Sequence, residues 1–282
     1  MEKTEINIKD FKNELFVGVI FLLMYFPTLI WMWDRWFARD SYYSHGIMIP
    51  FVVGFLIWSK RKILAKLPKV SSPWGIQLII AGLVIHIFSA VFRVYFSSGF
   101  SMILVLYGLV LYFYGEKIFK ELLFPISFLI FMVPLPEVAI IGISFRLKLF
   151  AARIAAWTLN SIRLPALQDG STIRMLHAQV VVDDVCSGLR SLISLTALSA
   201  IFAYMMSTNI LKRLILFSSA IPIAVITNVC RVVILASISE IWGAKYAVGF
   251  IHDATGFSVF ILGFVLLFSL GKLLEEGDIK SD

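Results

Sequence analysis

Apolar residues run along this chain in long stretches separated by short polar segments. A membrane-spanning helix needs about 20 such residues, with a range of roughly 17–25. The pattern therefore predicts an all-α polytopic membrane protein with about eight transmembrane helices. The predicted spans are Leu15–Trp33, Ser44–Trp58, Gly75–Phe92, Phe100–Tyr114, Leu122–Val133, Leu189–Met206, Leu214–Ile238 and Ala254–Leu270. The second and fifth are short for a span, so their ends are poorly defined by the pattern.

The basic residues between these stretches predict the orientation of the chain. Loop Ser59–Ser72 contains five Lys and Arg residues, as is typical of a cytoplasmic loop. Lys212–Arg213 and the tail from Lys272 are expected on the same side. All these basic segments fall on the cytoplasmic side only if the apolar segment Glu137–Asn160 does not span the bilayer.

Segment Glu137–Asn160 is predicted to lie on the outer membrane surface or to re-enter the bilayer. Its Arg146 and Arg153 are seven residues apart, which places them on one face of a helix. The polar stretch that follows contains two β-favouring runs, Ser171–Leu176 and Gln179–Val185, which predict a small extracytoplasmic β-hairpin.

The expected organisation is one membrane domain over residues 1–282. Within it, residues 137–188 form the extracytoplasmic interfacial helix and hairpin that lead to a cysteine. Composition agrees, since 60% of the residues are hydrophobic and only 15% are charged, against about 25% charged residues in soluble domains. Membrane topology also explains the net charge of +7, so we expect no nucleic-acid partner.

Cys186 stands between the second predicted strand and an apolar helix. A thiol at a helix N-terminus is stabilised as the thiolate by free N–H groups and the helix dipole. Arg190, one turn later, adds positive charge, whereas Asp183 and Asp184 act against a thiolate. Cys186 is thus a candidate nucleophile; it could equally be a small buried residue or a palmitoylation site.

Arg231 is a charge inside the predicted span Leu214–Ile238. Placing an arginine near the bilayer centre costs roughly 2.5–3.5 kcal/mol, which makes such a residue a functional-site hypothesis. The alternative is that its side chain snorkels to the interface. Asn228, one turn away, is placed to orient the guanidinium. The neighbouring Cys230 is expected to be buried and inert.

His252 begins the last predicted span and is the candidate general base. Taken alone it could be an ordinary interfacial histidine capped by Asp253. His45, at the outer start of the second span, competes for the same role. The predicted topology gathers Cys186, Arg231 and both histidines at one membrane face. A cysteine, a histidine base and an arginine oxyanion donor suffice for acyl transfer, and no metal site or cofactor is expected.

The residues around these positions resemble those of the exosortases, the bacterial relatives of the archaeosortases. The matching segments are Tyr43–Gly46 with Pro50, Asp184–Ser191, Asn228–Arg231, and His252–Asp253 followed by Gly256. They run in order from the second span to the end of the chain. Archaeosortases tend to have an arginine where this chain has His252, so the likeness is to the bacterial branch.

The resemblance implies a cysteine peptidase or transpeptidase of the bacterial inner membrane, with its active site on the extracytoplasmic face. Its partners would be exported proteins that carry a C-terminal sorting signal, made of a Pro-Glu-Pro-like motif, a helix and a basic tail. Such enzymes are often linked to exopolysaccharide and biofilm matrix production. The resemblance assigns the nucleophile to Cys186, the oxyanion-stabilising arginine to Arg231 and the acid/base residue to His252.

Two other functions fit the same residues. A polysaccharide transporter or matrix-assembly component would use Arg231 and Arg153 to hold an anionic sugar. A membrane thiol acyltransferase would depend on Cys186 but would carry lipid on the thiol. A transporter has no need of the cysteine, so Cys186 separates the first of these from the peptidase.

Overall fold

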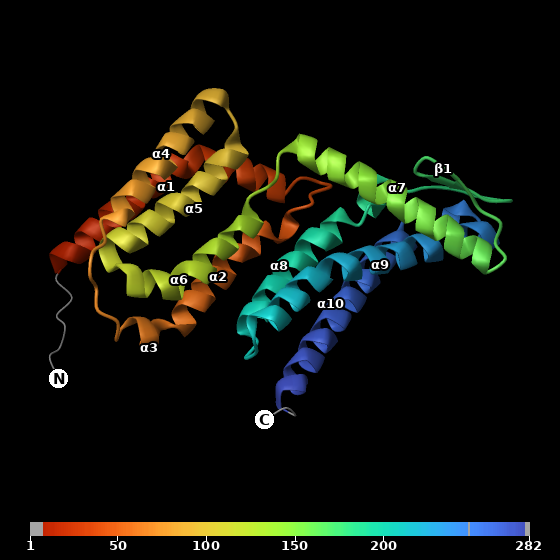
Figure 1. Ribbon diagram of the computed structural model, residues 1–282. Helices are drawn as coiled ribbons and strands as arrows, with labels where there is room; N and C mark the ends of the chain where they lie inside the picture. Colours follow the sequence, from red (N-terminus) through yellow and green to blue (C-terminus); the bar gives the residue numbers. More distant parts are fainter. Residues whose placement is uncertain (1–7, 248, 280–282) are drawn as a thin grey trace. The chain divides into compact units, whose positions relative to one another are not determined.

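The computed structural model describes residues 8–247 and 249–279 (Figure 1). Contacts divide the chain into two compact units. The first comprises Met1–Arg39 and Ser44–Pro134, and the second Asp40–Tyr43 and Leu135–Asp282. The expectation of a single membrane domain stays a prediction.

The first unit consists of helices. They are α1 (Ile8–Trp36), η1 (Ser44–Met48), α2 (Ile49–Ser59), α3 (Arg61–Leu64), α4 (Trp74–Phe92), α5 (Tyr95–Tyr114), α6 (Glu116–Phe128) and η2 (Leu129–Met132). Helices α4 and α5 pack closely, because a Cβ atom on Gly75 would lie only 2.5 Å from the backbone nitrogen of Tyr112. The Tyr25 hydroxyl of α1 is hydrogen-bonded to Ser101 of α5 at 2.9 Å. Small residues and buried hydroxyls of this kind hold helices together in lipid.

The second unit combines helices with a small sheet. Its elements are α7 (Glu137–Ser161), β1 (Leu167–Asp169), β2 (Thr172–Arg174), β3 (Gln179–Val181), η3 (Asp184–Cys186), α8 (Leu189–Met205), α9 (Ile210–Trp242), η4 (Ala244–Tyr246) and α10 (Phe250–Ile279). The candidate residues of the chemistry other than His45 all belong to this unit.

The predicted span count of eight is not confirmed. Five helices are long and apolar enough to cross a membrane: Lys12–Trp36, Trp74–Phe92, Tyr95–Tyr114, Ile210–Trp242 and Phe250–Glu276. A sixth results if Glu116–Met132 and Glu137–Ser161 form one broken span. Ser44–Ser59 and Leu189–Met205 are apolar but shorter. The chain is therefore a mostly helical, multi-pass membrane protein with five or six candidate spans among the described residues.

Helix α7 corresponds to the segment that was expected not to span. Its inner face is made of small residues such as Ala152 and Ala155, which are fully buried against α9. Arg146 and Arg153 are both exposed on α7, which agrees with the single helical face that their seven-residue spacing predicted. Trp157, also on α7, is 70% exposed. This mixture of apolar and cationic outward side chains fits a helix at a lipid–water interface, and that placement stays a prediction.

The predicted hairpin is present, but the sheet contains one more strand than predicted. Strands β2 and β3 pair antiparallel, with Ile173 opposite Val180. The prediction missed β1, which adds a third strand on the other edge of β2. The strands are also shorter than predicted. Ile173 and Val182 are buried and pack against α7 and α9, so burial of one face explains why so short a sheet forms.

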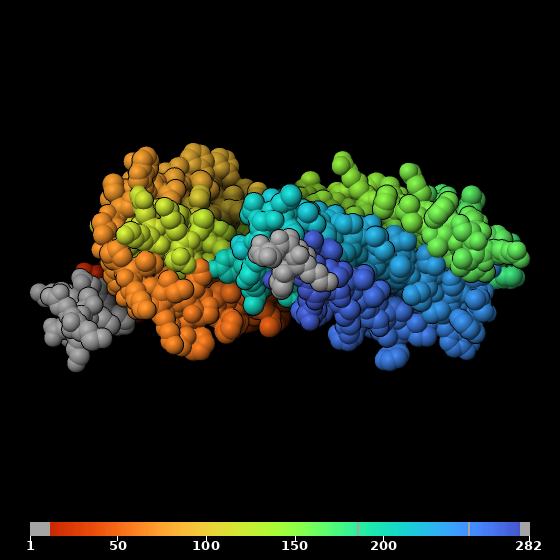
Figure 2. All heavy atoms as spheres, turned by 60° about the horizontal axis from the view of Figure 1, so that its bottom comes forward, coloured from red at the N-terminus to blue at the C-terminus, as the bar shows by residue number. Residues whose placement is uncertain are grey.

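Helices α8, α9 and α10 form a bundle in the second unit. The loop after α8 and the last part of α10 lie side by side (Figure 2). There the Ser207 N–H donates to Glu275 at 3.1 Å, and Lys212 Nζ donates to the Leu274 carbonyl at 2.9 Å. The basic residues at Lys212 and Lys272 therefore lie at the same end of this bundle. That arrangement fits the predicted cytoplasmic placement of both.

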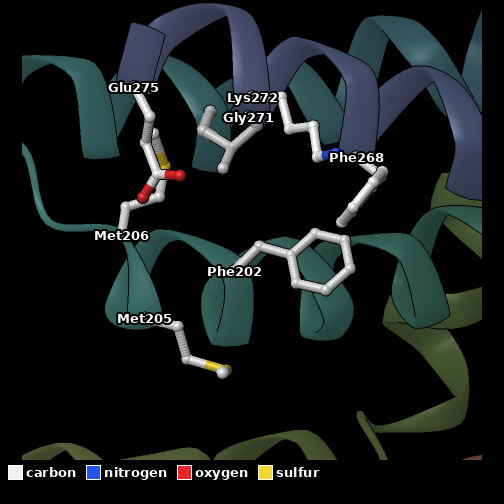
Figure 3. A pocket seen from close by; sticks show the side chains of 8 residues that line it. Phe202, Met205, Met206, Phe268, Gly271, Lys272 and Glu275 are labelled. Carbon is white, nitrogen blue, oxygen red and sulfur yellow. The ribbon is translucent and has the colours of Figure 1, made fainter. Parts of the chain in front are cut away.

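A cavity of about 280 Å³ lies at this same end of the bundle (Figure 3). Phe202, Met206 and Phe268 supply its apolar lining, and Lys272 and Glu275 its charged groups. Cys186 precedes the opposite end of α8, about 25 Å away for 17 helical residues. The cavity is thus separate from the candidate chemistry.

Candidate active site

Cys186 is the last residue of the short turn η3, which joins the sheet to α8. The turn is closed by the Cys186 N–H, which donates to the Asp183 carbonyl at 2.9 Å. On the other side, the Asn228 side-chain amide of α9 donates to the Cys186 carbonyl at 2.9 Å. Cys186 is 8% exposed and belongs to the core between α7, the sheet and α9. Backbone hydrogen bonds therefore fix the thiol from both sides.

Gly188 explains why the chain turns into α8 immediately after the cysteine. Its φ is +82°, a left-handed conformation that glycine adopts without a steric penalty. A Cβ atom on Gly188 would lie only 2.7 Å from Cγ of Asn228. The glycine thus permits both the turn and the close approach of the Asn228 amide to Cys186.

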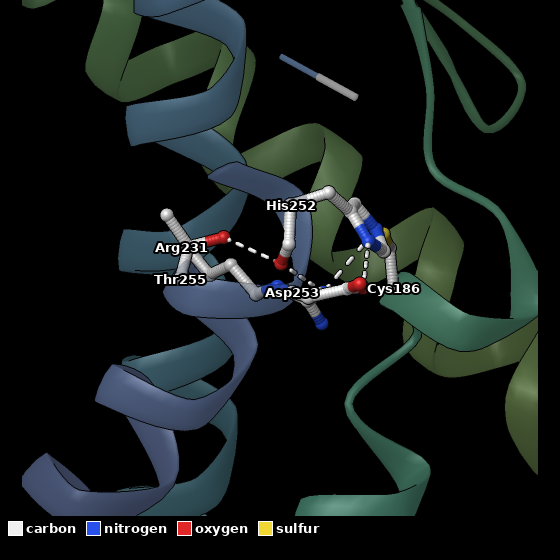
Figure 4. A network of polar contacts seen from close by, with 5 residues as sticks. All are labelled: Cys186, Arg231, His252, Asp253 and Thr255. Atoms are coloured by element: carbon white, nitrogen blue, oxygen red, sulfur yellow. Dashed lines mark hydrogen bonds and ion pairs between the residues drawn. The ribbon is translucent and has the colours of Figure 1, made fainter. Parts of the chain in front are cut away.

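Three side chains from η3, α9 and α10 converge at the thiol (Figure 4). Cys186 Sγ lies 3.0 Å from Nε2 of His252. Arg231 Nη2 lies 3.2 Å from the same nitrogen and donates to the His252 carbonyl, also at 3.2 Å. Gly256, one turn along α10, provides the space, because a Cβ atom there would be 3.1 Å from Nη2 of Arg231. The fold thus brings His252 into contact with Cys186, 66 positions away in the sequence, and with Arg231, 21 positions away.

His252 is also held by groups of its own helix. Its Nδ1 lies 3.4 Å from the Asp253 carboxylate, which is 86% exposed. The Thr255 hydroxyl donates to the His252 carbonyl at 2.9 Å. With its proton on Nδ1, facing Asp253, the ring presents Nε2 to the thiol as an acceptor.

The surroundings of Cys186 raise the pKa of its thiol and so disfavour the thiolate. Burial raises the pKa of the Cys186 thiol, the Arg231 guanidinium lowers it by a smaller amount, and the Asp183 carboxylate raises it further. The net effect is a raised pKa, so the thiol is protonated at neutral pH. The sequence left this pKa open, because the helix N-terminus and Arg190 favour a thiolate whereas Asp183 and Asp184 oppose it. Burial decides for the thiol, and Arg190 is not among the charges that shift the pKa.

Removing the Asp183 charge is expected to make the thiol more reactive. Asp183→Asn should lower the Cys186 pKa and raise its alkylation rate at neutral pH by about two- to fivefold, the scale of an exposed charge interaction. Arg231→Gln should have the opposite effect. Iodoacetamide labelling across pH, in a Cys230→Ser background, measures both. Equal rates for the two variants would contradict this account of the pKa.

Asp184 ties the cysteine turn to α7. Its carboxylate accepts from the Ser144 hydroxyl at 2.9 Å and from Lys148 Nζ at 3.1 Å. Lys148 and Ser144 together hold the pKa of this carboxyl below its usual range. From the sequence, Asp184 was expected to oppose a thiolate, and its contacts with Lys148 and Ser144 were not predicted. A carboxylate two residues before the cysteine, with a lysine in the preceding apolar helix, was the available signal.

The site lies about one hydrocarbon thickness from the basic end of the bundle. From His252 to Lys272, α10 advances 20 residues, or about 30 Å at 1.5 Å per residue. From Lys212 to Arg231, α9 advances nearly as far. The hydrocarbon core of a bilayer is about 30 Å thick. If the basic end marks one membrane boundary, the three converging side chains lie near the other.

The remaining candidates are placed as follows. His45 belongs to the first unit, where it lies in η1. Arg190 lies half-buried in the first turn of α8. The hydrogen bond from Asn228 goes to Cys186 and not to Arg231, so its predicted role is corrected to holding the cysteine turn. Cys230 was predicted to be buried, and that is wrong, because its side chain is exposed on the outside of α9.

The comparison with known families matches the chain over the region that contains this site. A family model described as transmembrane exosortase matches residues 31–269, which is most of the chain. No curated protein and no solved structure matches it. The match begins within α1 and ends within α10, so it includes all three converging residues.

Proposed function

Because the chain belongs to the transmembrane exosortase family, we propose that it is a membrane-embedded cysteine peptidase or transpeptidase acting on the C-terminal sorting signal of exported proteins. The observation that carries the proposal is the 3.0 Å contact between Cys186 Sγ and His252 Nε2, with Arg231 beside it. A nucleophile, a base within hydrogen-bond reach and an adjacent cation are the parts that acyl transfer requires.

The first step follows from the protonated resting thiol. As Cys186 Sγ attacks the scissile carbonyl carbon, His252 Nε2 takes the thiol proton, so the base acts during attack instead of forming an ion pair beforehand. A bond between sulfur and carbon forms, and the carbonyl π electrons move onto oxygen. The Asp253 carboxylate, 3.4 Å from Nδ1, accepts the hydrogen on that nitrogen and leaves Nε2 facing the thiol.

Arg231 stabilises the oxyanion that forms when the carbonyl is attacked. In the resting site its Nη2 contacts the His252 carbonyl and ring. Once the ring is protonated, a guanidinium and an imidazolium repel each other, while the new oxyanion attracts both. A preorganised donor of this kind stabilises the transition state by about 2.7–4 kcal/mol.

The tetrahedral intermediate then collapses to a thioester. The carbon–nitrogen bond breaks, the imidazolium proton goes to the leaving amine, and the acyl part of the substrate remains on Cys186. Water or an amine next attacks the thioester, with His252 taking its proton and returning it to the sulfur. Water gives proteolysis, and an amine gives transpeptidation to an acceptor.

Arg231→Met is expected to lower the processing rate by about 10²–10³-fold, as removal of one oxyanion donor does elsewhere. The loss should fall on kcat more than on KM, because the interaction forms in the transition state. Arg146→Gln, an exposed arginine of α7, is the matched control and should process normally. A loss confined to KM would show that Arg231 binds substrate and does not stabilise the oxyanion.

The location we propose is the bacterial inner membrane, with the site at the extracytoplasmic boundary. The distance of the site from the basic end of the bundle supports this. A substrate helix parallel to α10, with its basic tail at the cytoplasmic end, would present the residues before its helix at the level of Cys186. Partners are therefore exported proteins that carry a spanning helix near the C-terminus.

Intact mass of a co-expressed candidate substrate tests the function. We expect loss of the mass of the C-terminal helix and tail when the full chain is present, and none when it is absent. Hydrolysis gives a free carboxylate, and any added mass identifies an amine acceptor. A substrate that stays whole beside a correctly inserted chain, across candidates with complete signals, would contradict the proposal.

The same measurement separates the two rival functions. A thiol acyltransferase would leave labelled lipid on Cys186 and no cleaved peptide. A polysaccharide carrier would need Arg153 and Arg231 at one site. However, Arg153 is exposed on α7, whereas Arg231 is 8% exposed and contacts His252.

A further inference from the structure

The small sheet has one edge whose backbone groups are left for another strand. Beside the two strands, the Val182 N–H donates to the Ser171 carbonyl and the Met175 N–H to the Ala178 carbonyl, both at 2.9 Å, which fixes the alternation along the ladder between β2 and β3. Residue Val180 therefore turns its N–H and C=O toward β2. Val181 turns its own toward the open edge of β3.

This edge is free in the described part of the chain. No described group donates to or accepts from the outward N–H and C=O of Val181. The Val181 side chain is 48% exposed. The other face of the strand is covered, since Val180 and Val182 pack toward α9. Strand β1 forms the opposite edge and lies against α7.

The free edge leads directly to the candidate nucleophile. Val181 precedes Cys186 by five residues, and Asp183 between them is extended, with φ −74° and ψ 172°. The turn η3 then brings the thiol to His252 of α10, which faces the end of this segment (Figure 4). A peptide whose carbonyl reaches Sγ therefore meets the open edge of β3 five residues before the cysteine.

Strand β3 runs along α9, from the C-terminal part of that helix toward Cys186. The His177 N–H at the start of β3 donates to the Glu240 carboxylate of α9, at 3.0 and 3.1 Å to its two oxygens. At the other end, Asn228 of α9 donates to Cys186. Twelve residues of α9 separate these contacts, about 18 Å of helix. Strand β3 thus runs from the outer end of α9 down to the site.

We propose that the edge of β3 is a peptide-binding subsite, in which the substrate residues before the scissile bond bind as an added strand parallel to β3. This rests on the proposed function. An exported chain that enters the membrane by a C-terminal helix runs from outside toward the membrane, which is the direction of β3. Backbone pairing gives affinity without reading side chains, and alternate side chains face the exposed side of the sheet.

Disulfide trapping tests this pairing without any chemistry at Cys186. Val181→Cys in a Cys186→Ala, Cys230→Ser chain is co-expressed with substrates that carry one cysteine at successive positions. A parallel added strand predicts trapping at every second position, centred about three to five residues before the scissile bond at about 3.3 Å per residue. Leu167→Cys on β1, a side chain that is 69% exposed, is the matched control and should trap none.

The outcomes are distinguishable from failure of the proposed function. Alternating traps support the subsite even where the wild-type chain does not cleave that substrate. Traps at consecutive positions, equal traps from Leu167→Cys, or no trap from Val181→Cys with a substrate that the wild type cleaves would each overturn it. In the active chain, Val181→Pro removes the outward N–H and should raise KM about tenfold with kcat little changed, whereas Leu167→Thr on β1 should behave as wild type.

Discussion

Cys186→Ala is expected to lower release of the substrate's C-terminal helix by at least about 10³-fold, since knocking out a covalent nucleophile removes the acyl-enzyme route altogether. The change deletes one sulfur atom from a side chain that is already buried, and the backbone bonds that hold the turn remain. The protein should therefore fold and insert normally. Intact mass of the co-expressed substrate measures processing, and a membrane-fraction immunoblot measures insertion.

Cys230→Ser is the matched control, because Cys230 is the only other cysteine in the chain and neighbours Arg231. Its side chain is exposed on α9, so processing should stay within about twofold of wild type. A thioester adduct on the wild-type chain, released by hydroxylamine and absent from Cys186→Ala, would show the covalent intermediate itself. Wild-type processing by Cys186→Ala would remove this residue from the chemistry.

His252→Gln is expected to lower processing by about 10²–10⁴-fold, the range for loss of a general base. The reason is the raised pKa of the Cys186 thiol: with no thiolate in the resting site, attack depends on a group that accepts the proton as the bond forms. Glutamine keeps a polar side chain of similar length but cannot take up the proton. Single-turnover rates of both chains on one substrate give the ratio.

The same substitution at the competing histidine decides which of them is the base. His45→Gln should leave the processing rate near that of the wild type, since the observed thiol contact is made by His252. If instead His45→Gln abolished processing and His252→Gln did not, the base would be His45. The two variants therefore assign the role in either case.

The sequence predicted the membrane character and made Cys186 and Arg231 candidates for chemistry, in both cases from local features. Hydropathy, the cost of an arginine in an apolar run, and a cysteine between a strand and a helix are all properties of short stretches of chain. They singled out Cys186 and Arg231, whereas His252 could not be separated from His45 by its local sequence, and the resemblance to exosortases assigned it the acid/base role. The family match over residues 31–269 confirms that resemblance.

Span boundaries were less predictable, because helices continue where apolar runs stop. Helix α5 begins at Tyr95, five residues before the predicted span, and includes Ser98, whose hydroxyl is hydrogen-bonded to Thr28 of α1. A polar residue that is hydrogen-bonded inside a bundle does not end a helix, but it ends a hydropathy window. In α2, by contrast, the apolar run gives a helix of only 11 residues.

Contacts between distant segments were decided by the tertiary structure alone. The sequence placed Asn228 near Arg231, since they share one helix, but packing of α9 against η3 directs the amide to Cys186. It predicted a buried Cys230, yet the rotation of α9 that buries Arg231 and Asn228 turns Cys230 outward. Only a known set of helix neighbours fixes which face of a uniformly apolar helix is buried.

The pKa of the Cys186 thiol likewise depends partly on local sequence and partly on tertiary packing. From the sequence, a helix N-terminus and a nearby arginine favoured a thiolate, because charges close in the chain can be counted. Burial of Cys186 between α7, the sheet and α9 raises its pKa more than Arg231 lowers it. The sequence thus determined which groups are present and predicted one membrane face for them. The packing decided that the thiol is desolvated and meets His252, because desolvation depends on every atom around a group and not on its neighbours in the chain.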